Sequence, residues 1–211
     1  MIIHYLGVCY SPMKNSEMQQ QIVQAAEARF KLYGYQKTTM AEIAGDCQMS
    51  AANLYRYFNN KLAIAAVLAK RCLEEIELSL SAIVTKEQLS ASERLQQFVL
   101  SQLHQTYHYF DSAPKLGELV EAMTTQRPEI IEAHRQQKLA LLKQLLQQGQ
   151  SAKEFVFDDL AATADAIHSA TLLFYFPLTL GLYPLAVLEE KAVHVNQLLL
   201  RGLKNHHEAQ I

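Results

Sequence analysis

A short stretch around residue 53 carries side chains whose types and spacing suit contact with a nucleic acid. Asn53 would lie in the first turn of a short helix, and an asparagine amide can pair with N6 and N7 of adenine in the major groove. Ala51 and Ala52 offer small apolar contacts, for instance to a thymine methyl group. Hydroxyl and cationic side chains nearby suit phosphate oxygens, which position a protein without reading sequence. The candidate DNA-contacting residues are Thr38, Thr39, Ser50, Ala51, Ala52, Asn53, Tyr55, Arg56, Tyr57 and Lys61.

Two helix-start signals predict the short helices that must position these side chains. Thr39 followed three residues later by Glu42 is a capping box, in which each side chain satisfies an otherwise unpaired amide of the first turn. This signal predicts a helix over 40–47. Ser50 is a second N-cap residue, and it predicts a helix over 51–57.

A longer helix, expected over 16–33, would brace this pair. Its apolar residues recur at helical spacing, and Gly34 then supplies the left-handed conformation that ends a helix. Two short helices joined by a turn and braced by a third form the helix-turn-helix arrangement. Its second helix enters the major groove of DNA.

The same region carries a recognisable family pattern. Its residues are Phe30 and Gly34 at the end of the first helix, Thr38, Thr39, Ile43 and Ala44 at the second, and Leu54, Tyr55, Tyr57, Phe58 and Lys61 around the third. Over 22–71 the chain therefore resembles the DNA-binding region of TetR/AcrR-family transcriptional regulators. The resemblance implies phosphate contacts from Thr38, Thr39, Tyr55 and Lys61. Gln48 departs from the pattern, which usually has Gly there because the backbone tends towards positive φ, a conformation that costs other residues some energy.

Composition predicts an all-α fold of about nine helices. Half of the 211 residues are hydrophobic and 19% are charged, while 7 Gly and 5 Pro are too few turn-formers for many short strands. Beyond residue 60, periodicity and the Pro and Gly positions predict helices over 61–83, 90–110, 115–123, 128–148 and 184–203. Another would begin after Asp158 or Asp159 and end at Pro177, and Gly149 would end the helix over 128–148.

We expect a helix-turn-helix DNA-binding domain over 13–60 and a helical ligand-binding and dimerisation domain over 61–211, with 1–12 a disordered or non-native extension. The net charge is -2, yet residues 13–61 hold six Lys and Arg against four Asp and Glu. So small a basic excess requires two copies to bind together, which fits the family's homodimers on palindromic double-stranded operators. The last two expected helices are apolar enough to pair across subunits. The candidate interface residues are Ile167, Phe174, Val195, Leu198 and Leu199.

The resemblance also implies a small-molecule effector, whose pocket would lie among the helices of the second domain. Aromatic and soft side chains there suit a mostly apolar ligand, with two histidines as polar anchors, although ordinary core packing explains the same stripe. The candidate ligand-binding residues are Leu103, Tyr107, His108, Phe110, Met123, His168, Leu172 and Tyr175. No cofactor is implied.

Sequence features favour a protein of the reducing cytoplasm. The three cysteines lack the CxxC spacing of a zinc site and the even number of a disulfide framework. The N-terminal residues lack the leading positive charge and continuous apolar run of a signal peptide. The apolar stretch 170–188 is crossed by Pro177, Gly181 and Pro184, so it suits a buried helix and its exit better than a membrane span.

Two other classes of function stay open at this point. The first is a helical metal-binding protein or enzyme: His104 and His108 lie one turn apart, and Asp111, Glu118 or His168 would have to supply a third ligand. The chain has no Gly-rich phosphate loop, GxSxG or HExxH, so catalysis is not expected. The second is an interaction module without DNA binding, which Gln48 and the Ala-rich helix would favour.

Overall fold

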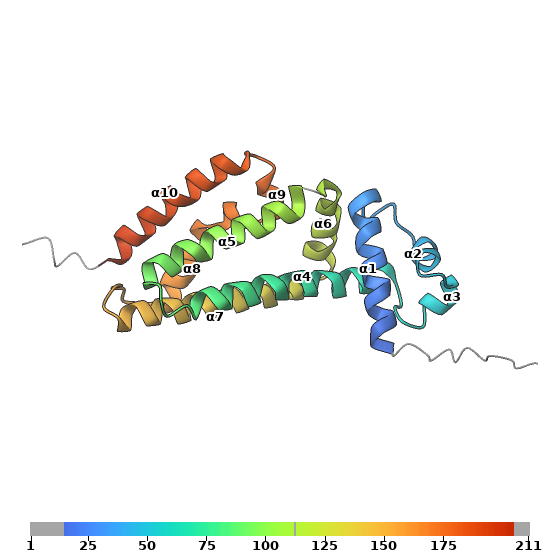
Figure 1. Ribbon diagram of the computed structural model, residues 1–211, viewed down its shortest axis with the longest axis horizontal. Coiled ribbons are helices and arrows are strands. Elements are labelled where there is room, and N and C mark those ends of the chain that lie inside the picture. Colours follow the sequence, from blue (N-terminus) through green and yellow to red (C-terminus); the bar gives the residue numbers. More distant parts are fainter. Residues whose placement is uncertain (1–14, 112, 205–211) are drawn as a thin grey trace, which may run out of the picture.

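The computed structural model describes residues 15–111 and 113–204, which form ten α-helices, two short 3-10 helices and no strand (Figure 1). The expected all-α fold is confirmed, and the expected extension over 1–12 lies outside the described residues. The elements are α1 (Asn15–Tyr33), α2 (Met40–Asp46), α3 (Ala51–Leu54), α4 (Lys61–Val84), α5 (Ala91–Asp111), η1 (Pro114–Leu116), α6 (Gly117–Gln126), α7 (Pro128–Ser151), α8 (Leu160–Ala170), η2 (Leu172–Phe174), α9 (Pro177–Leu180) and α10 (Leu185–Leu203).

Helices α1, α2 and α3 form the helix-turn-helix at one end of the molecule, on the right in Figure 1. Both expected caps are present. The Thr39 amide donates to the Glu42 carboxylate at 2.8 Å while the Glu42 amide donates to the Thr39 hydroxyl, and the Asn53 amide donates to the Ser50 hydroxyl at 3.2 Å. Gly34, at φ +93°, confirms the expected left-handed end of α1.

The turn between α2 and α3 contains the strained residue that the family pattern predicts. Gln48 adopts φ +54°, which confirms the expected positive angle. Helix α3 ends at Leu54, three residues earlier than expected. Beyond it the amides of Arg56 and Tyr57 bond to carbonyls three residues back, so the chain continues as a tight turn instead of an α-helix.

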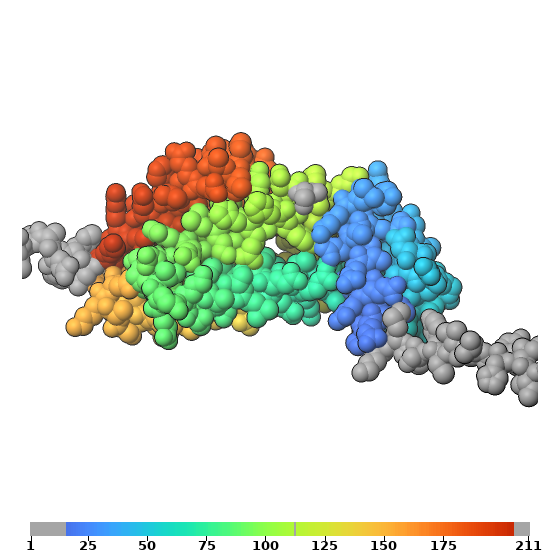
Figure 2. Space-filling model, in the orientation of Figure 1, coloured from blue at the N-terminus to red at the C-terminus, as the bar shows by residue number. Residues whose placement is uncertain are grey.

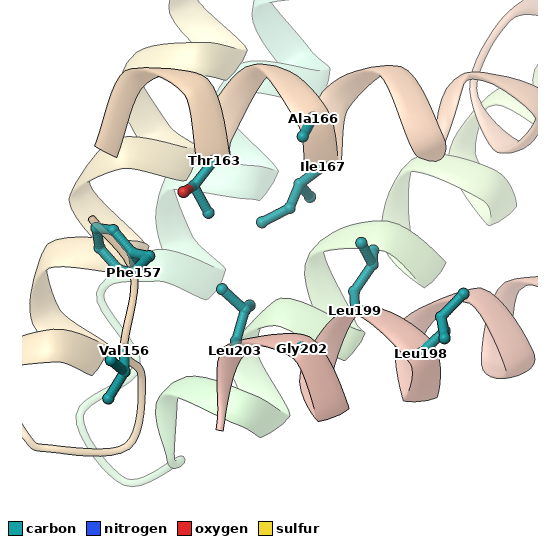
Figure 3. Close-up of a pocket in the computed structure, with 9 residues that line it drawn as sticks. All are labelled: Val156, Phe157, Thr163, Ala166, Ile167, Leu198, Leu199, Gly202 and Leu203. Carbon is teal, nitrogen blue, oxygen red and sulfur yellow. The ribbon is translucent and has the colours of Figure 1, made fainter. Parts of the chain in front are cut away.

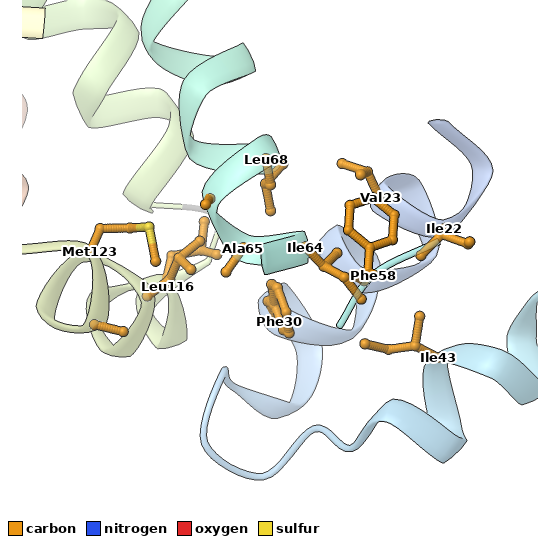
Figure 4. Close-up of a cluster of buried hydrophobic side chains, with 14 of the residues drawn as sticks. Ile22, Val23, Phe30, Ile43, Phe58, Ile64, Ala65, Leu68, Leu116 and Met123 are labelled. Atoms are coloured by element: carbon orange, nitrogen blue, oxygen red, sulfur yellow. The ribbon is translucent and has the colours of Figure 1, made fainter. Parts of the chain in front are cut away.

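One hydrophobic core joins this end of the molecule to the rest (Figure 4). Phe30 of α1 and Ile43 of α2 pack with Ile64 in the first turns of α4. Leu116 of η1 and Met123 of α6 belong to the same cluster. Helix α4 begins after the N-cap residue Asn60 and is shared by the two halves of the fold, which it connects as one continuous helix.

The second half of the fold is a layered helical bundle. Helix α4 packs against α5 and α7, α7 packs against α8, and α10 lies on α5 (Figure 1). Two cores fill this bundle. One surrounds Leu95, Phe98 and Leu145, and the other surrounds Leu103 and Phe174.

Gly149 does not end α7, contrary to expectation. The helix continues to Ser151, where Lys153 takes the left-handed position at φ +61°. The Lys153 amide donates to the Gln150 carbonyl and the Glu154 amide to the Gly149 carbonyl, which is the bonding of a Schellman end. Gly149 is required inside the helix because the Phe155 ring lies against it.

Helix α8 ends at Ala170, well before the expected stop at Pro177. The Thr171 hydroxyl donates to the Ile167 carbonyl at 2.8 Å, and the ring of Tyr175 stacks on His168 with centroids 5.2 Å apart. The chain therefore folds back through η2 and then forms the short helix α9. This break accounts for ten α-helices where about nine were expected.

Candidate functional site

The first candidate site is the surface of α3 and its flanking turns. Helices α1 to α3 form one end of the elongated molecule, and this surface lies there (Figure 2). Nine of the ten predicted DNA-contacting residues are at least partly exposed, and Thr38 is buried. The exposed ones are Thr39, Ser50, Ala52, Tyr55 and Arg56, and the half-buried ones are Ala51, Asn53, Tyr57 and Lys61.

Arg56 and Asn53 have side chains available for a ligand. Arg56 is exposed and makes no hydrogen bond or ion pair with the described residues, so its guanidinium is free to bind a phosphate. The Asn53 amide makes only a weak contact, with its Nδ2 atom 3.9 Å from the Met49 sulfur. The Asn53 side-chain amide is therefore available to pair with a base edge.

Thr38 does not fit its predicted role as a phosphate contact. Its side chain is 1% exposed, and its hydroxyl donates to the Gly34 carbonyl at 2.8 Å. The side chain fastens the turn after α1 instead of facing solvent. We therefore correct this prediction.

Lys61 also departs from its predicted role. Its ammonium donates to the carbonyls of Tyr35, Gln36 and Thr38 at 2.5, 3.1 and 2.7 Å, and it lies 4.4 Å from the centre of the Tyr35 ring. A lysine has three donors, and all three are engaged within the chain. Burial lowers the pKa of this ammonium. Lys61 fixes the loop between α1 and α2 and has no donor left for a phosphate.

An ion pair and an overlooked lysine complete this surface. Arg29 of α1 binds Asp46 of α2 at 2.8 Å, and the bond to Arg29 lowers the pKa of the Asp46 carboxyl. Lys37 is exposed just before α2 and makes no hydrogen bond or ion pair with the part of the chain that the structure describes. Sequence reasoning missed Lys37, although a positive charge beside a helix start was a usable signal.

The second candidate site is a cavity of about 670 Å³ between the end of α5, η1 and the segment from α9 to the start of α10. It is large enough for a drug-sized molecule. Two predicted ligand residues, Tyr107 and Phe110, line it. The other lining residues, most of which sequence reasoning missed, are Asp111, Pro114, Gly117, Pro177, Leu178, Leu180, Gly181, Leu182, Tyr183 and Pro184.

The remaining six predicted ligand residues do not line this cavity, so the predicted set is not one site. Leu103 and Met123 are buried in two different cores. Leu172 is 47% exposed, and His108 is exposed on α5. His168 and Tyr175 instead contact each other, with 3.0 Å between the Tyr175 hydroxyl and Nε2 of His168.

A buried group of ionisable side chains surrounds Lys138 in the middle of α7. Its Nζ atom lies 3.3 Å from the centre of the Tyr175 ring, and burial lowers the pKa of Lys138 to about 7. Burial likewise lowers the pKa of His134 to about 3 and that of His168 to about 4. The Nδ1 atom of His134 lies 2.6 Å from the carboxylate of Glu77. This group ties α4, α7 and α8 together.

A third hollow, of about 370 Å³, is an apolar groove between α8 and α10 (Figure 3). The side chains of Ile167, Leu199 and Leu203 point into it from the two helices. Leu198 stands beside the groove and is 70% exposed.

Phe174 and Ile167 are corrections to the predicted dimer interface. Phe174 is 1% exposed and Ile167 is 2% exposed, so both serve the core of one subunit. The early end of α8 places Phe174 in η2, where it faces inward against α5. Leu198, Leu199 and the partly buried Val195 stay candidates for the interface.

The histidines proposed for a metal site have another partner. Nε2 of His104 lies 2.7 Å from the carboxylate of Glu189, while His108 is a neighbour on the same helix. Across residues 15–111 and 113–204, no three His, Cys, Asp or Glu side chains are grouped as metal ligands are. In the same part of the chain, no helix has the length and apolarity to cross a membrane.

Solved structures of similar fold are regulators of transcription. A transcriptional regulator from Cytophaga hutchinsonii has 21% identity and a TM-score of 0.70, with 88% of this chain and 98% of the other covered. SmeT, the repressor of the Stenotrophomonas maltophilia multidrug efflux pump SmeDEF, has 17% identity and a TM-score of 0.65 over 89% and 91% of the two chains. The ketosteroid transcriptional regulator KstR2 of Mycobacterium tuberculosis has 18% identity and a TM-score of 0.57 over 89% and 95%. No curated protein matches the chain.

Two family models match consecutive parts of the sequence. Residues 22–68 match the bacterial regulatory proteins of the tetR family, and residues 91–195 match the tetracyclin repressor-like C-terminal domain. The first match covers the helix-turn-helix, and the second covers most of the helical bundle behind it. The chain therefore belongs to the TetR/AcrR family of transcriptional regulators.

Proposed function

We propose that this transcriptional regulator is a homodimeric repressor that binds a palindromic operator in the cytoplasm and is released by a small, mostly apolar effector. The observation that carries the proposal is the surface of α3, where Asn53 and Arg56 have available polar groups on a helix braced by α1 and α2. A helix in that position enters the major groove, with its first turn towards the bases. Asn53 would read a base, and Arg56 and Lys37 would bind phosphates.

The second subunit supplies the affinity that one subunit lacks. Few exposed cations surround α3, so binding to phosphates requires both copies on adjacent half-sites. The exposed apolar residues Val193 and Leu198 of α10, beside the groove along α8, support a dimer built from these two helices. A twofold axis there would match the symmetry of a palindrome.

An effector is supported by the cavity at the end of α5, which has the volume and apolar lining of a small-molecule site. The names of the similar proteins agree with this assignment: one represses a multidrug efflux pump and another is a ketosteroid regulator. A ligand that prefers the conformation unable to bind DNA must weaken operator binding by its own differential affinity.

The experiment is selection of bound fragments from genomic DNA, followed by footprinting of the selected fragment. We expect a protected region with two symmetric half-sites whose centres are separated by about one helical turn or a multiple of it. Binding should weaken steeply as salt is raised, because phosphate contacts release counterions. Equal recovery of all fragments, with no discrete protected region, would contradict the proposal.

A further inference from the structure

The cavity at the end of α5 has a lining that specifies more than an apolar ligand. Three aromatic residues, Tyr107, Phe110 and Tyr183, line it together with the acidic residue Asp111. Among the described residues that line it there is no Lys, Arg or His. Lys191 lies over the Tyr183 ring at 5.0 Å without lining the cavity. Aromatic faces and a carboxylate both attract a positive charge.

The wall of this cavity is also the part of the regulatory domain that holds α1. Pro114 and Gly117 line the cavity. Between them, Lys115 donates to the Leu32 carbonyl at the end of α1, with 2.8 Å between the atoms. The residue after Gly117 is Glu118, and its carboxylate accepts from the Gln36 amide at 2.7 Å, just beyond α1.

At the end of α5, residues that line the cavity likewise lie next to a residue that contacts α1. Tyr107 and Phe110 line the cavity, while Tyr109 between them turns to the other side. There its hydroxyl donates to the Glu27 carboxylate of α1 at 3.3 Å, and Glu27 also binds Lys31 and Arg71. This wall is therefore bonded to α1 through Lys115, to the segment just beyond α1 through Glu118, and, through Tyr109, to Glu27 of α1, which also binds Arg71 of α4.

We propose that this cavity binds an aromatic ligand bearing one positive charge, and that its occupancy is transmitted to the DNA-binding end through the bonds of Lys115 and Glu118 to the end of α1. The proposal rests on the proposed function, because it assigns the effector class and the route of its action. The bound ligand separates Pro114 and Gly117 from α9. Lys115 and Glu118 move with them, and their bonds shift the end of α1 relative to α4. DNA binding weakens because α3 is braced by α1.

Ligand binding is tested first, without DNA, by calorimetric titration of the purified protein with three probes of one shape. Naphthylmethylamine is cationic, naphthalenemethanol is neutral and naphthoate is anionic at neutral pH. We expect affinity to fall in that order, and Asp111→Asn to remove the advantage of the amine over the alcohol. That advantage should be roughly three- to fivefold, the scale of an exposed charge pair. Equal affinity for amine and naphthoate would overturn the charge assignment.

A cavity-filling variant locates the bound probe. Gly181 lines the cavity, and a Cβ there would have no heavy atom within 4 Å, so a side chain can be added at this position without a clash at its Cβ. Gly181→Trp adds an indole at the cavity wall. We expect this variant to lose at least tenfold in affinity for naphthylmethylamine. Ala140→Trp, at an exposed position of α7, is the control and should bind as the native chain does. Undiminished binding by Gly181→Trp would place the probe elsewhere and overturn the proposal.

Transmission is tested with the DNA fragment selected by the native protein. Saturating naphthylmethylamine should raise the DNA dissociation constant of the native chain at least fivefold. In the double variant Lys115→Ala, Glu118→Ala that factor should fall below twofold, while its affinity for the probe in the absence of DNA is retained. An undiminished factor in the double variant would overturn the route. A chain that binds the probe as expected but selects no DNA would contradict the proposed function and leave the ligand assignment standing.

Discussion

Gly149 lies directly against the ring of Phe155, and a Cβ built on residue 149 would come within 2.2 Å of a ring carbon. Phe155 is 1% exposed and belongs to the core between α5, α7 and α8. A glycine in the last turns of α7 costs helix stability, yet it lets the chain after α7 return onto the core. Packing against Phe155 therefore explains why residue 149 is a glycine, and helix propensity does not.

Gly149→Ala should destabilise the protein by about 1–3 kcal/mol, the usual cost of overpacking a core. The methyl group would meet the Phe155 ring and, at 2.9 Å, the side chain of Ala91. Gly45→Ala in α2 is the matched control, because its Cβ would have no heavy atom within 4 Å. That control should be stabilising by up to about 1 kcal/mol. Urea denaturation measures both, and equal effects of the two substitutions would show that the close contact is absent.

Lys138→Met should stabilise the protein, most strongly at and below pH 7. Lys138 is 3% exposed, and its folded pKa of about 7 lies below its ordinary value of 10.5. Between these values the unfolded chain binds more protons, so stability of the native protein rises with pH from about 7 to 10. The gain from Lys138→Met should be on the order of a few kcal/mol at pH 6 and shrink towards pH 10.

Denaturation of the native chain and of Lys138→Met in urea at pH 6 and pH 9 tests this dependence. The cation–π contact with Tyr175 favours the charged amine and so works against the lowered pKa. A gain that is the same at both pH values would mean that Lys138 titrates normally in the folded protein.

Arg56→Ala should affect DNA binding, whereas Lys61→Ala should affect stability. Removing the free guanidinium of Arg56 should weaken binding to all DNA sequences and lower the salt slope by about one phosphate contact per subunit. Removing Lys61 should leave that slope in place and lower the free energy of unfolding by about 1.5–3 kcal/mol, because three carbonyls lose a charged donor. A lowered salt slope for Lys61→Ala at unchanged stability would restore its predicted phosphate contact.

Leu198→Glu should separate the dimer into folded monomers. Leu198 is 70% exposed on α10 beside the groove, so a charge there is tolerated by one subunit and buried only by pairing. Leu78→Glu, at a 72% exposed position of α4, is the control and should stay dimeric. Phe174→Glu should unfold the chain instead, since Phe174 is a core residue. Light scattering at micromolar concentration, with circular dichroism for folding, distinguishes these results, and a dimeric Leu198→Glu would make the interface assignment wrong.

Local signals predicted much of the fold. The capping box of Thr39 and Glu42, the caps at Ser50 and Asp159, and the left-handed Gln48 are all present, because each depends on a few neighbouring residues. Periodicity likewise predicted α4, α5 and α7 to within a few residues at each end.

Tertiary contacts account for the features that the sequence did not predict. Thr38 turns inward to the Gly34 carbonyl, and Lys61 is enclosed by the loop between α1 and α2. The effector residues were scattered because one apolar stripe on α5 serves a core at Leu103 and a cavity at Phe110. A family pattern names residue types at positions, but it does not say which polar groups are already satisfied within the chain.

Sequence-specific recognition of DNA by α3 is tested most directly by two affinities of the native protein at physiological salt. One is for the selected fragment and the other is for a scrambled fragment of equal length and base composition. We expect a ratio of at least about 10³ in favour of the selected fragment. Asn53→Ala should reduce that ratio by lowering affinity for the selected fragment alone. A ratio near one for the native protein would show that α3 does not recognise a DNA sequence.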